Sequence, residues 1–430
     1  MNPSAMTARR GISWWLFVIG LLLVPFSTGT EVAVMSYGLP ALLVLNLCYI
    51  AMQIQTPVLS ARQQLPAGLG FLLIIAITAT SLYAPEPQAS FARVAPNIIG
   101  FLVFLYLLSP FFQGDRMDTR FESVAKVYVA SATIVAFYYL INFIGAVNKI
   151  GLAGVFLDRV TGGIISLPWG ATNVVASVLL LPMLLTFYFG VTEPRKKVRA
   201  YYFIARTAMV ATILMTQSRG AMLSGAFGLV LLAMFFKGRD RRRLLIFVAI
   251  TWLLWTLFDR WVSSIMEEQV ISEIVARFSG DDISSLNGRV EIWQQFAAEF
   301  WNSPLIGSGY YSTLYTIGSS GHNLVLTTVI ERGLIGLALS AGILLKAAEE
   351  VVKGFFRANT QNTRLFFACL GAGGAASMLH LMVEDANFTQ QYIVYSWVAL
   401  ALVFQAVEVL PDAVPEKTPI LSQPTLIYKT

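Results

Sequence analysis

Residues 171–190 read ATNVVASVLLLPMLLTFYFG and contain no charged side chain. A helix needs about 20 mostly apolar residues to cross the ~30 Å hydrocarbon core of a bilayer, so this stretch predicts a transmembrane helix. Similar apolar runs lie near residues 12–27, 32–53, 67–84, 94–113, 123–146, 200–216, 220–237, 244–261, 322–346, 364–381 and 391–409. The twelve runs together predict an all-α polytopic membrane protein.

The composition supports a membrane protein and excludes several other classes. Of the 430 residues, 56% are hydrophobic and 13% are charged, against roughly 25% charged in soluble domains. Two cysteines, Cys48 and Cys369, lie inside apolar runs, which excludes a disulfide scaffold and a cysteine zinc cluster. With only His322 and His380 as histidines, a multi-histidine metal centre is not expected. The net charge of +6 comes from membrane loops and predicts no nucleic-acid partner.

The lysines and arginines predict which loops face the cytoplasm, because cytoplasmic loops of membrane proteins are enriched in them. With the N-terminus inside, the inside loops carry most of the basic residues, including clusters at 195–199 and 237–243. The outside loops carry few: Arg93, Lys149, Arg159, Arg219, Arg260, Arg277 and Arg289. This bias places both termini in the cytoplasm.

One outside loop is far longer than a connector between helices needs to be. We divide the chain into transmembrane helices 1–9 in residues 1–262, a periplasmic loop in 263–321, helices 10–12 in 322–410 and a cytoplasmic tail in 411–430. Apolar spacing predicts two amphipathic helices in the loop, at 263–278 and 289–301, and the second has an aromatic face suited to a membrane interface. Functional residues are expected in this loop.

Two arginines on the outside face are candidate anion ligands. Arg219 lies in the short gap QSRG (217–220) between two apolar runs, and Arg289 follows an Asn-Gly break at the start of the aromatic helix. Each has a structural alternative: Arg219 as a helix-end arginine reaching the head groups, and Arg289 as a solvated side chain near a turn. The functional alternative is a clamp on phosphate groups.

His322 is the candidate general base. It follows the sequence GSSG (318–321) where the outside loop re-enters the membrane, and an imidazole has the pKa best suited to removing a proton from a hydroxyl near neutral pH. Its structural alternative is a helix cap or a contact with head groups. For His380 a buried hydrogen bond is favoured over catalysis. Glu331 and Arg332, deep in the tenth run, predict a mutual or interhelical ion pair.

Two further patterns carry little weight. Asp281 and Asp282 resemble the acidic pairs that hold divalent metals, but their neighbours are typical of a turn, so no metal site is predicted. Auxiliary candidates for the outside site are Asn323, Tyr310, Arg159 and Asp385.

Taken in order, the motifs resemble the O-antigen ligase family, within a superfamily that also holds O-antigen polymerases and O-linked oligosaccharyltransferases. The motifs are QSRG at 217–220, Asn287-Gly288-Arg289 with Trp293, SPLIGSG at 303–309, His322-Asn323 and ERGLIG at 331–336. The resemblance covers roughly residues 205–340, and the N-terminal half shares only hydropathy and helix count.

The resemblance implies a glycosyl transfer on the periplasmic face of the bacterial inner membrane. The donor would be a polysaccharide on undecaprenyl diphosphate and the acceptor a sugar hydroxyl of lipid A–core. Arg219 and Arg289 would hold the diphosphate, His322 would be the base, and no metal ion or other cofactor would take part. Besides these substrates, only membrane lipids are expected as partners.

Three alternatives remain at this point. A polymerase would join repeat units on the same lipid carrier. An O-linked oligosaccharyltransferase would use the same loop, although those that resemble this pattern usually carry an added C-terminal domain. A twelve-helix secondary transporter is a third, but transporters usually show two corresponding halves, and the large loop has no counterpart in the first half.

Overall fold

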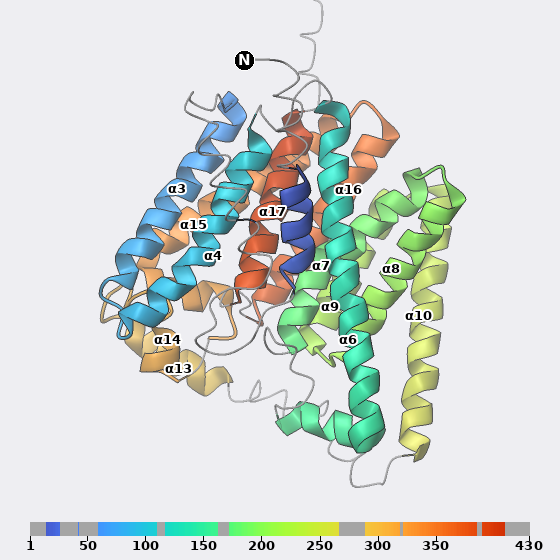
Figure 1. Cartoon of the computed structure of the whole chain (residues 1–430), viewed down its shortest axis with the longest axis horizontal. Coiled ribbons are helices and arrows are strands. Elements are labelled where there is room, and N and C mark those ends of the chain that lie inside the picture. Colours follow the sequence, from blue (N-terminus) through green and yellow to red (C-terminus); the bar gives the residue numbers. More distant parts are fainter. Residues whose placement is uncertain are drawn as a thin grey trace, which may run out of the picture.

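The computed structural model describes residues 14–25, 42, 59–109, 117–161, 172–265, 289–318, 321–384 and 389–408. All regular structure in these ranges is helical (Figure 1). The helices are α3 (Ala61–Ser81), α4 (Pro87–Leu108), α6 (Met117–Thr161), α7 (Thr172–Thr192), α8 (Lys196–Met215), α9 (Arg219–Phe235), α10 (Gly238–Ile265), α13 (Arg289–Phe300), α14 (Thr313–Thr316), α15 (Leu324–Arg357), α16 (Gln361–Leu381) and α17 (Gln390–Glu408).

Within the described residues, eight helices are long and apolar enough to cross a membrane. Two shorter apolar helices, Trp14–Leu23 and α9, accompany them. The prediction of an all-α polytopic membrane protein is therefore confirmed. The number twelve stays a prediction, since the run at 32–53 lies almost wholly outside the described residues and α10, which covers 244–261, is not among the eight.

The core of the bundle is formed by α7, α16 and α17, whose apolar side chains are the most completely buried. Figure 1 shows α3, α4 and α15 on one side of α17 and α8 and α10 on the other. Small residues let the helices approach, as is common between membrane helices. An added Cβ at Gly100 would lie 2.4 Å from the indole of Trp397 on α17, and one at Gly70 would lie 2.6 Å from the ring of Phe101 and 3.2 Å from that indole.

Two long helices are broken by glycines in the left-handed region. Gly151 has φ 74° inside α6, and the last turns of that helix bend away from its axis in Figure 1. Gly333 has φ 64° inside α15, a helix that also continues past the predicted end at residue 346 to Arg357. Glycine adopts this conformation without the steric cost that a Cβ would impose.

The loop helices are described in part. The predicted helix at 289–301 is present as α13. The predicted helix at 263–278 lies outside the described residues beyond Ile265, where α10 ends, and so do Asp281 and Asp282.

Short turns connect α7 to α8, α8 to α9 and α9 to α10, so consecutive helices run in opposite directions. The starts of α7 and α9 therefore lie at one end of the bundle, which we call the His322 end. The starts of α8 and α10 lie at the opposite end.

Candidate functional site

The connection between α8 and α9 holds Arg219 at the His322 end. Gln217 has φ 52°, an uncommon conformation for a residue with a side chain, and it turns the chain sharply. Ser218 then caps α9 by accepting a hydrogen bond from the Ala221 amide at 3.4 Å. Gly220 lies against the end of α16, because a Cβ there would be 2.7 Å from Val383 and 3.1 Å from the ring of His380. Arg219 is thus fixed beside the end of α16.

The aromatic face of α13 packs against protein and supports the chain that leads into His322. The indole nitrogen of Trp293 donates a hydrogen bond to the carbonyl of Gly321 at 2.8 Å. Phe296 is fully buried and lies over Gly321, where an added Cβ would be 2.7 Å from its ring. Trp301, by contrast, is 76% exposed and remains available to a membrane interface. The aromatic face of α13, which the sequence predicts at a membrane interface, therefore also packs against other parts of the protein.

His322 itself is held in an unusual backbone conformation. Its φ is 44°, in the left-handed region that residues with a Cβ seldom adopt. The next residue, Asn323, fixes the turn: its side-chain oxygen caps α15 by accepting from the amides of Val325 and Leu326, and its Nδ2 donates to the Met382 carbonyl at 2.8 Å. The imidazole is presented from this turn with a third of its side chain exposed.

Glu384, just after α16, joins the two predicted groups. One carboxylate oxygen lies 3.3 Å from Nδ1 of His322, and the other lies 3.7 Å from Nη2 of Arg289. Asn173, at the start of α7, donates a hydrogen bond to that second oxygen at 2.7 Å. Glu384 is almost completely buried, so a carboxylate without such partners would be costly here.

The charges in this cluster act on one another. Burial acts to raise the pKa of Glu384, yet the hydrogen bond and charge of His322, with the charges of His380 and Arg289, outweigh it and lower the pKa below its ordinary value. Burial also lowers the pKa of Arg289, and the positive charge of Arg219 acts in the same direction while Glu384 opposes it. Arg219 and Glu384 therefore act on the charge of Arg289 in opposite directions.

His380 has the buried structural position that the sequence predicts. It is 1% exposed, and its Nε2 lies 3.4 Å from the carbonyl oxygen of Asn173. Its Nδ1 has no hydrogen-bond partner among the described residues and faces the start of α9 at Gly220. The ring therefore packs beneath the cluster rather than opening onto it.

Three of the four auxiliary candidates have a position in the structure, and the fourth, Asp385, lies outside the described residues. Asn323 is next to His322, but its side chain is engaged in capping α15. Tyr310 is buried elsewhere, with its hydroxyl accepting a hydrogen bond from Asn97 at 3.0 Å. Arg159 belongs to the last turns of α6, and its side chain lies outside the described part.

The turn that carries Tyr310 braces the break in α15. The amides of Ser308 and Gly309 donate to the carbonyls of Ile330 and Glu331, at 2.7 and 3.1 Å. Beyond the break, the amides of Leu334 and Ile335 donate to the carbonyls of Pro304 and Leu305, at 2.9 and 3.1 Å. The backbone groups released at Gly333 are therefore satisfied by the turn at 304–309. We call this pair of segments the glycine brace.

The predicted mutual or interhelical ion pair of Glu331 and Arg332 stays a prediction, and the structure gives each of them a further contact. The Glu331 carboxylate accepts a hydrogen bond from the Thr313 hydroxyl at 2.8 Å, and the Arg332 guanidinium lies over the ring of Tyr310, 5.4 Å from its centroid. Both contacts come from the segment 310–313, which packs against the break at Gly333.

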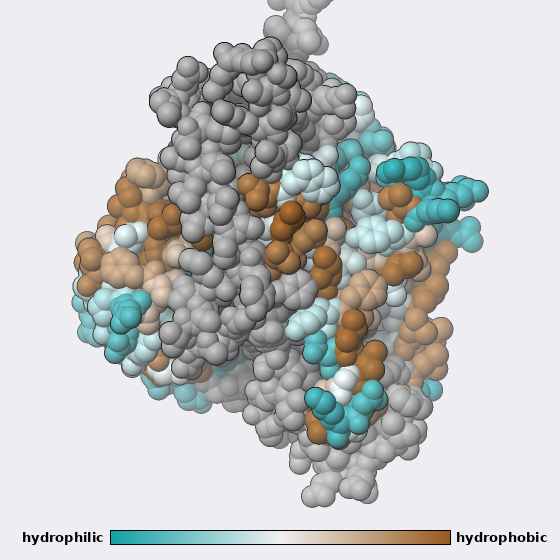
Figure 2. Space-filling model, viewed as in Figure 1, coloured by the Kyte–Doolittle hydropathy of each residue, from teal (hydrophilic) through white to brown (hydrophobic). Residues whose placement is uncertain are grey.

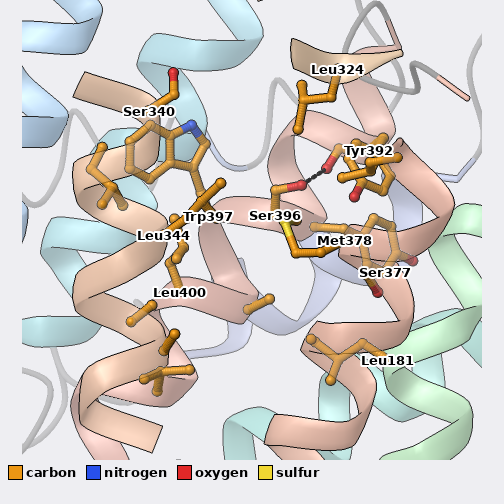
Figure 3. A pocket seen from close by; sticks show the side chains of 18 of the residues that line it. Leu181, Leu324, Ser340, Leu344, Ser377, Met378, Tyr392, Ser396, Trp397 and Leu400 are labelled. Atoms are coloured by element: carbon orange, nitrogen blue, oxygen red, sulfur yellow. Dashed lines mark hydrogen bonds between the residues drawn. The ribbon is translucent and has the colours of Figure 1, made fainter. Parts of the chain in front are cut away.

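An apolar cavity of about 430 Å³ begins beside the cluster and continues into the bundle. Near the cluster it is lined by Leu324 and Leu381, and deeper by Trp397 and Leu400 of α17. Figure 3 shows Leu324, Trp397 and Leu400 around the cavity, with the Ser396 hydroxyl donating to the Tyr392 carbonyl in its wall. An apolar chain could lie in this space with its polar end at the cluster.

Residues 204–341 match the model of a protein family described as O-antigen ligase. This segment of the chain is similar to the O-antigen ligase family. The match covers roughly a third of the chain and coincides with the segment of the sequence resemblance, which it confirms. No curated protein matches the chain.

The family match supports an enzyme of the O-antigen ligase or polymerase type, and so a glycosyltransferase-like membrane enzyme. Such a family implies lipid-linked glycan and lipid A–core substrates in general terms. Arg219, Arg289 and His322 lie inside the matched segment, whereas Glu384 and Asn173 lie outside it.

Sequence reasoning did not assign Glu384 or Asn173 to the site. Glu384 lies four residues after His380 at the outside end of a predicted helix, and an acidic residue at a helix end is common. Asn173 lies at the start of α7, the most apolar of the eight candidate membrane-spanning helices, as one of its few polar side chains. Their convergence depends on the packing of α7 against α16, which no local pattern reveals.

Proposed function

We propose that the chain is an O-antigen ligase that transfers a polysaccharide from undecaprenyl diphosphate to a sugar hydroxyl of lipid A–core. The observation that carries the proposal is the grouping of His322, Arg289 and Glu384 within 3.3–3.7 Å contacts, with Arg219 beside them. The site would face the periplasm, with both chain termini in the cytoplasm of a bacterium and the protein in its inner membrane.

The proposed reaction needs one base and a clamp for the leaving group. With Nδ1 of His322 donating to Glu384, Nε2 is left to accept the proton of the acceptor hydroxyl. The hydroxyl oxygen then forms a bond to the anomeric carbon of the donor as the bond from that carbon to the phosphate oxygen breaks. The bonding electron pair leaves with undecaprenyl diphosphate, and attack from the opposite face inverts the anomeric centre.

Arg219 and Arg289 would neutralise the charge that develops on the diphosphate. Guanidinium groups suit this task because each can donate two parallel hydrogen bonds to a phosphate. Glu384 is a positioning residue in this scheme: it fixes the imidazole and partly balances Arg289 before the donor binds. The apolar cavity beside the cluster would receive part of the polyprenyl chain.

The test is an assay with purified protein, lipid-linked polysaccharide and lipid A–core. We expect wild-type protein to form the joined product and His322→Ala to form almost none. Product that consists only of longer lipid-linked glycan, with lipid A–core unchanged, would replace the ligase with a polymerase. Normal activity of His322→Ala would remove the general-base role.

A deletion strain separates the same two functions in cells. Loss of a ligase leaves long polymer on the lipid carrier and bare core, because polymerisation continues without transfer. Loss of a polymerase leaves core with a single repeat unit. The second pattern would contradict the proposed function.

A further inference from the structure

A second group of arginines lies at the opposite end of the bundle from His322. Arg199 and Arg206 of α8 and Arg243 of α10 line a cavity of about 180 Å³. Phe203 and Phe236 form part of its apolar wall. We call this the α8–α10 pocket, and the chemistry proposed for His322 does not use it.

Arg206 has an unusual environment for a membrane-helix cation. Its guanidinium carbon lies 4.1, 4.5 and 5.4 Å from the ring centroids of Phe187, Phe247 and Phe203. Its Nε is buried without a hydrogen-bond partner, and it forms no ion pair with a carboxylate among the described residues. The rings stabilise the cation but cannot accept hydrogen bonds in its plane, where an oxygen ligand would fit.

The charges that line the pocket do not balance. Among the described residues that line the pocket, Asp240 is the one carboxylate, and it pairs with Arg243 at 3.2 Å. The nearby Glu193 pairs with Arg195 at 2.7 Å. Arg199 and Arg206, which line the same small cavity, form no ion pair with a carboxylate among the described residues. An unpaired cation within the hydrocarbon is costly, so an anion bound in the pocket would stabilise these arginines.

The depth of the pocket favours a lipid phosphate over a soluble one. Arg206 lies ten residues into α8, about 15 Å from its start by helical rise. Its side chain leans toward the helix start and so toward Arg199, which is nearer the membrane surface. Phe203, Ile204 and Leu245 beside the pocket are each more than half exposed. A phospholipid combines a phosphate for the arginines with acyl chains for these flanks.

The surface around the pocket has a hydrophilic part and a hydrophobic part, as a phospholipid does. Figure 2 shows hydrophilic side chains gathered at the upper right, over the ends of α8 and α10, and hydrophobic ones below them along α10. The helix α10 contacts the bundle sparsely, through α9 and through Phe247 against Phe187 and Phe203. A lipid in the pocket would add contacts between α8 and α10.

We propose that the α8–α10 pocket binds the phosphate group of an anionic phospholipid in the leaflet opposite the His322 cluster. By the predicted topology this is the cytoplasmic leaflet, where basic pockets between membrane helices bind anionic head groups. The bound lipid holds α10 against α8.

The test compares lipids and variants of the purified full chain in neutral detergent micelles. Thermal unfolding is followed while phosphatidylglycerol, phosphatidylcholine, inorganic phosphate or inorganic diphosphate is added, and native mass spectrometry counts retained lipids. The variants are Arg199→Gln, Arg206→Gln and Arg243→Gln. The matched control is Arg242→Gln, which removes the same charge from the neighbouring residue of Arg243 but does not line the pocket.

We expect phosphatidylglycerol, and not phosphatidylcholine, to raise the Tm of the wild type and of Arg242→Gln. Arg199→Gln and Arg206→Gln should each need about fivefold more phosphatidylglycerol for the same shift, and should retain less of it. Arg199 lies nearer the surface, so its variant keeps the test valid if Arg206→Gln folds poorly.

Three results would overturn the proposal. The first is an equal response of Arg199→Gln and Arg242→Gln to phosphatidylglycerol. The second is an equal effect of phosphatidylcholine, which would show that only the acyl chains matter. The third is a full shift with inorganic phosphate or diphosphate alone, which would assign the pocket to a soluble anion. All three readouts are independent of glycan transfer.

Discussion

The His322 cluster and the glycine brace both contain motifs that gave the family resemblance, yet they differ in what their residues contact. In the cluster, Arg289, His322 and Glu384 meet through ionisable side chains, two of which are partly exposed. In the brace, residues 304–309 and the turns of α15 on either side of Gly333 meet through backbone hydrogen bonds. A shared motif can therefore hold reacting groups or hold the helix that carries them, and only the contacts distinguish the two.

The largest effect is expected for His322→Ala, because general acid–base catalysis contributes roughly 10²–10⁴-fold. Transfer in the purified assay should fall by that factor, while the Tm stays close to wild type. His322→Gln is the sharper control, since an amide can keep the hydrogen bond to Glu384 but cannot take up a proton. Recovery of activity in that variant would make His322 a positioning residue.

For Gly333→Ala in the brace we expect a loss of stability, with the activity per folded molecule retained. An added Cβ would overlap the Leu305 carbonyl oxygen, and φ 64° disfavours any side chain. The two costs together come to roughly 2–5 kcal/mol. Thermal unfolding should show a clear drop in Tm, with activity lost only in proportion to folded protein. Gly68→Ala on α3, where a Cβ meets open space, is the control. A stable but inactive Gly333→Ala would move the brace into the catalytic machinery.

An intermediate effect is expected for Arg289→Lys, which keeps the charge but loses the planar pair of donors. Losing one hydrogen bond to a charged group costs roughly 1.5–3 kcal/mol, so donor use should weaken about tenfold or more. The measurement is KM for the lipid-linked donor. Arg93→Lys is the matched control, because the Arg93 guanidinium lies over the ring of Tyr311, 4.8 Å from its centroid. Equal KM values for the two variants would contradict a diphosphate clamp.

A smaller effect is expected for Asn323→Ala. Asn323 is next to His322 in the chain and caps α15, the helix that contains the brace. Loss of a helix N-cap costs about 1 kcal/mol, so the Tm should fall slightly. KM values for both substrates should remain near those of wild type, since the Asn323 side chain is occupied by the backbone. A large rise in either KM with an unchanged Tm would restore Asn323 as a substrate ligand.

The smallest effect concerns pH. Because the folded state lowers the pKa of Glu384, the carboxylate contributes stability above its ordinary pKa of 4.5, and that contribution is lost as the pH falls through the lowered value. The Tm of the wild type should therefore fall on acidification below about pH 4.5. In Glu384→Gln this part of the decline should be absent. Identical acid profiles for the two proteins would contradict the charged state of Glu384.

Much of the fold could be predicted from the sequence. Long apolar runs such as 171–190 and 364–381 produce α7 and α16 because only helices satisfy the backbone within a membrane. The break at Gly333 could not be predicted, since a single glycine in an apolar run does not show whether another segment accepts the freed backbone groups. The extension of α15 to Arg357 follows from local ion pairs such as Lys346 with Glu350 at 2.7 Å, which apolar periodicity does not record.

The candidate site could be predicted in part. Arg219, Arg289 and His322 stand out because charged or ionisable groups at outside helix ends are few. In the structure Arg289 and His322 both contact Glu384, and Arg219 is next to Gly220, which packs against His380. Tyr310 was grouped with them by its place in the long loop, but that turn packs against α4 and α15 instead. Glu384 was missed because its role depends on a contact between distant parts of the chain.

The position of Glu384 after residue 341 has a consequence for protein engineering. A chimera that exchanged only residues 204–341 between two such enzymes would transfer His322 without Glu384. The transferred imidazole would then have to pair with the carboxylate of the recipient protein. Grafts meant to carry specificity from one enzyme to another should therefore extend through the end of α16 and include the start of α7.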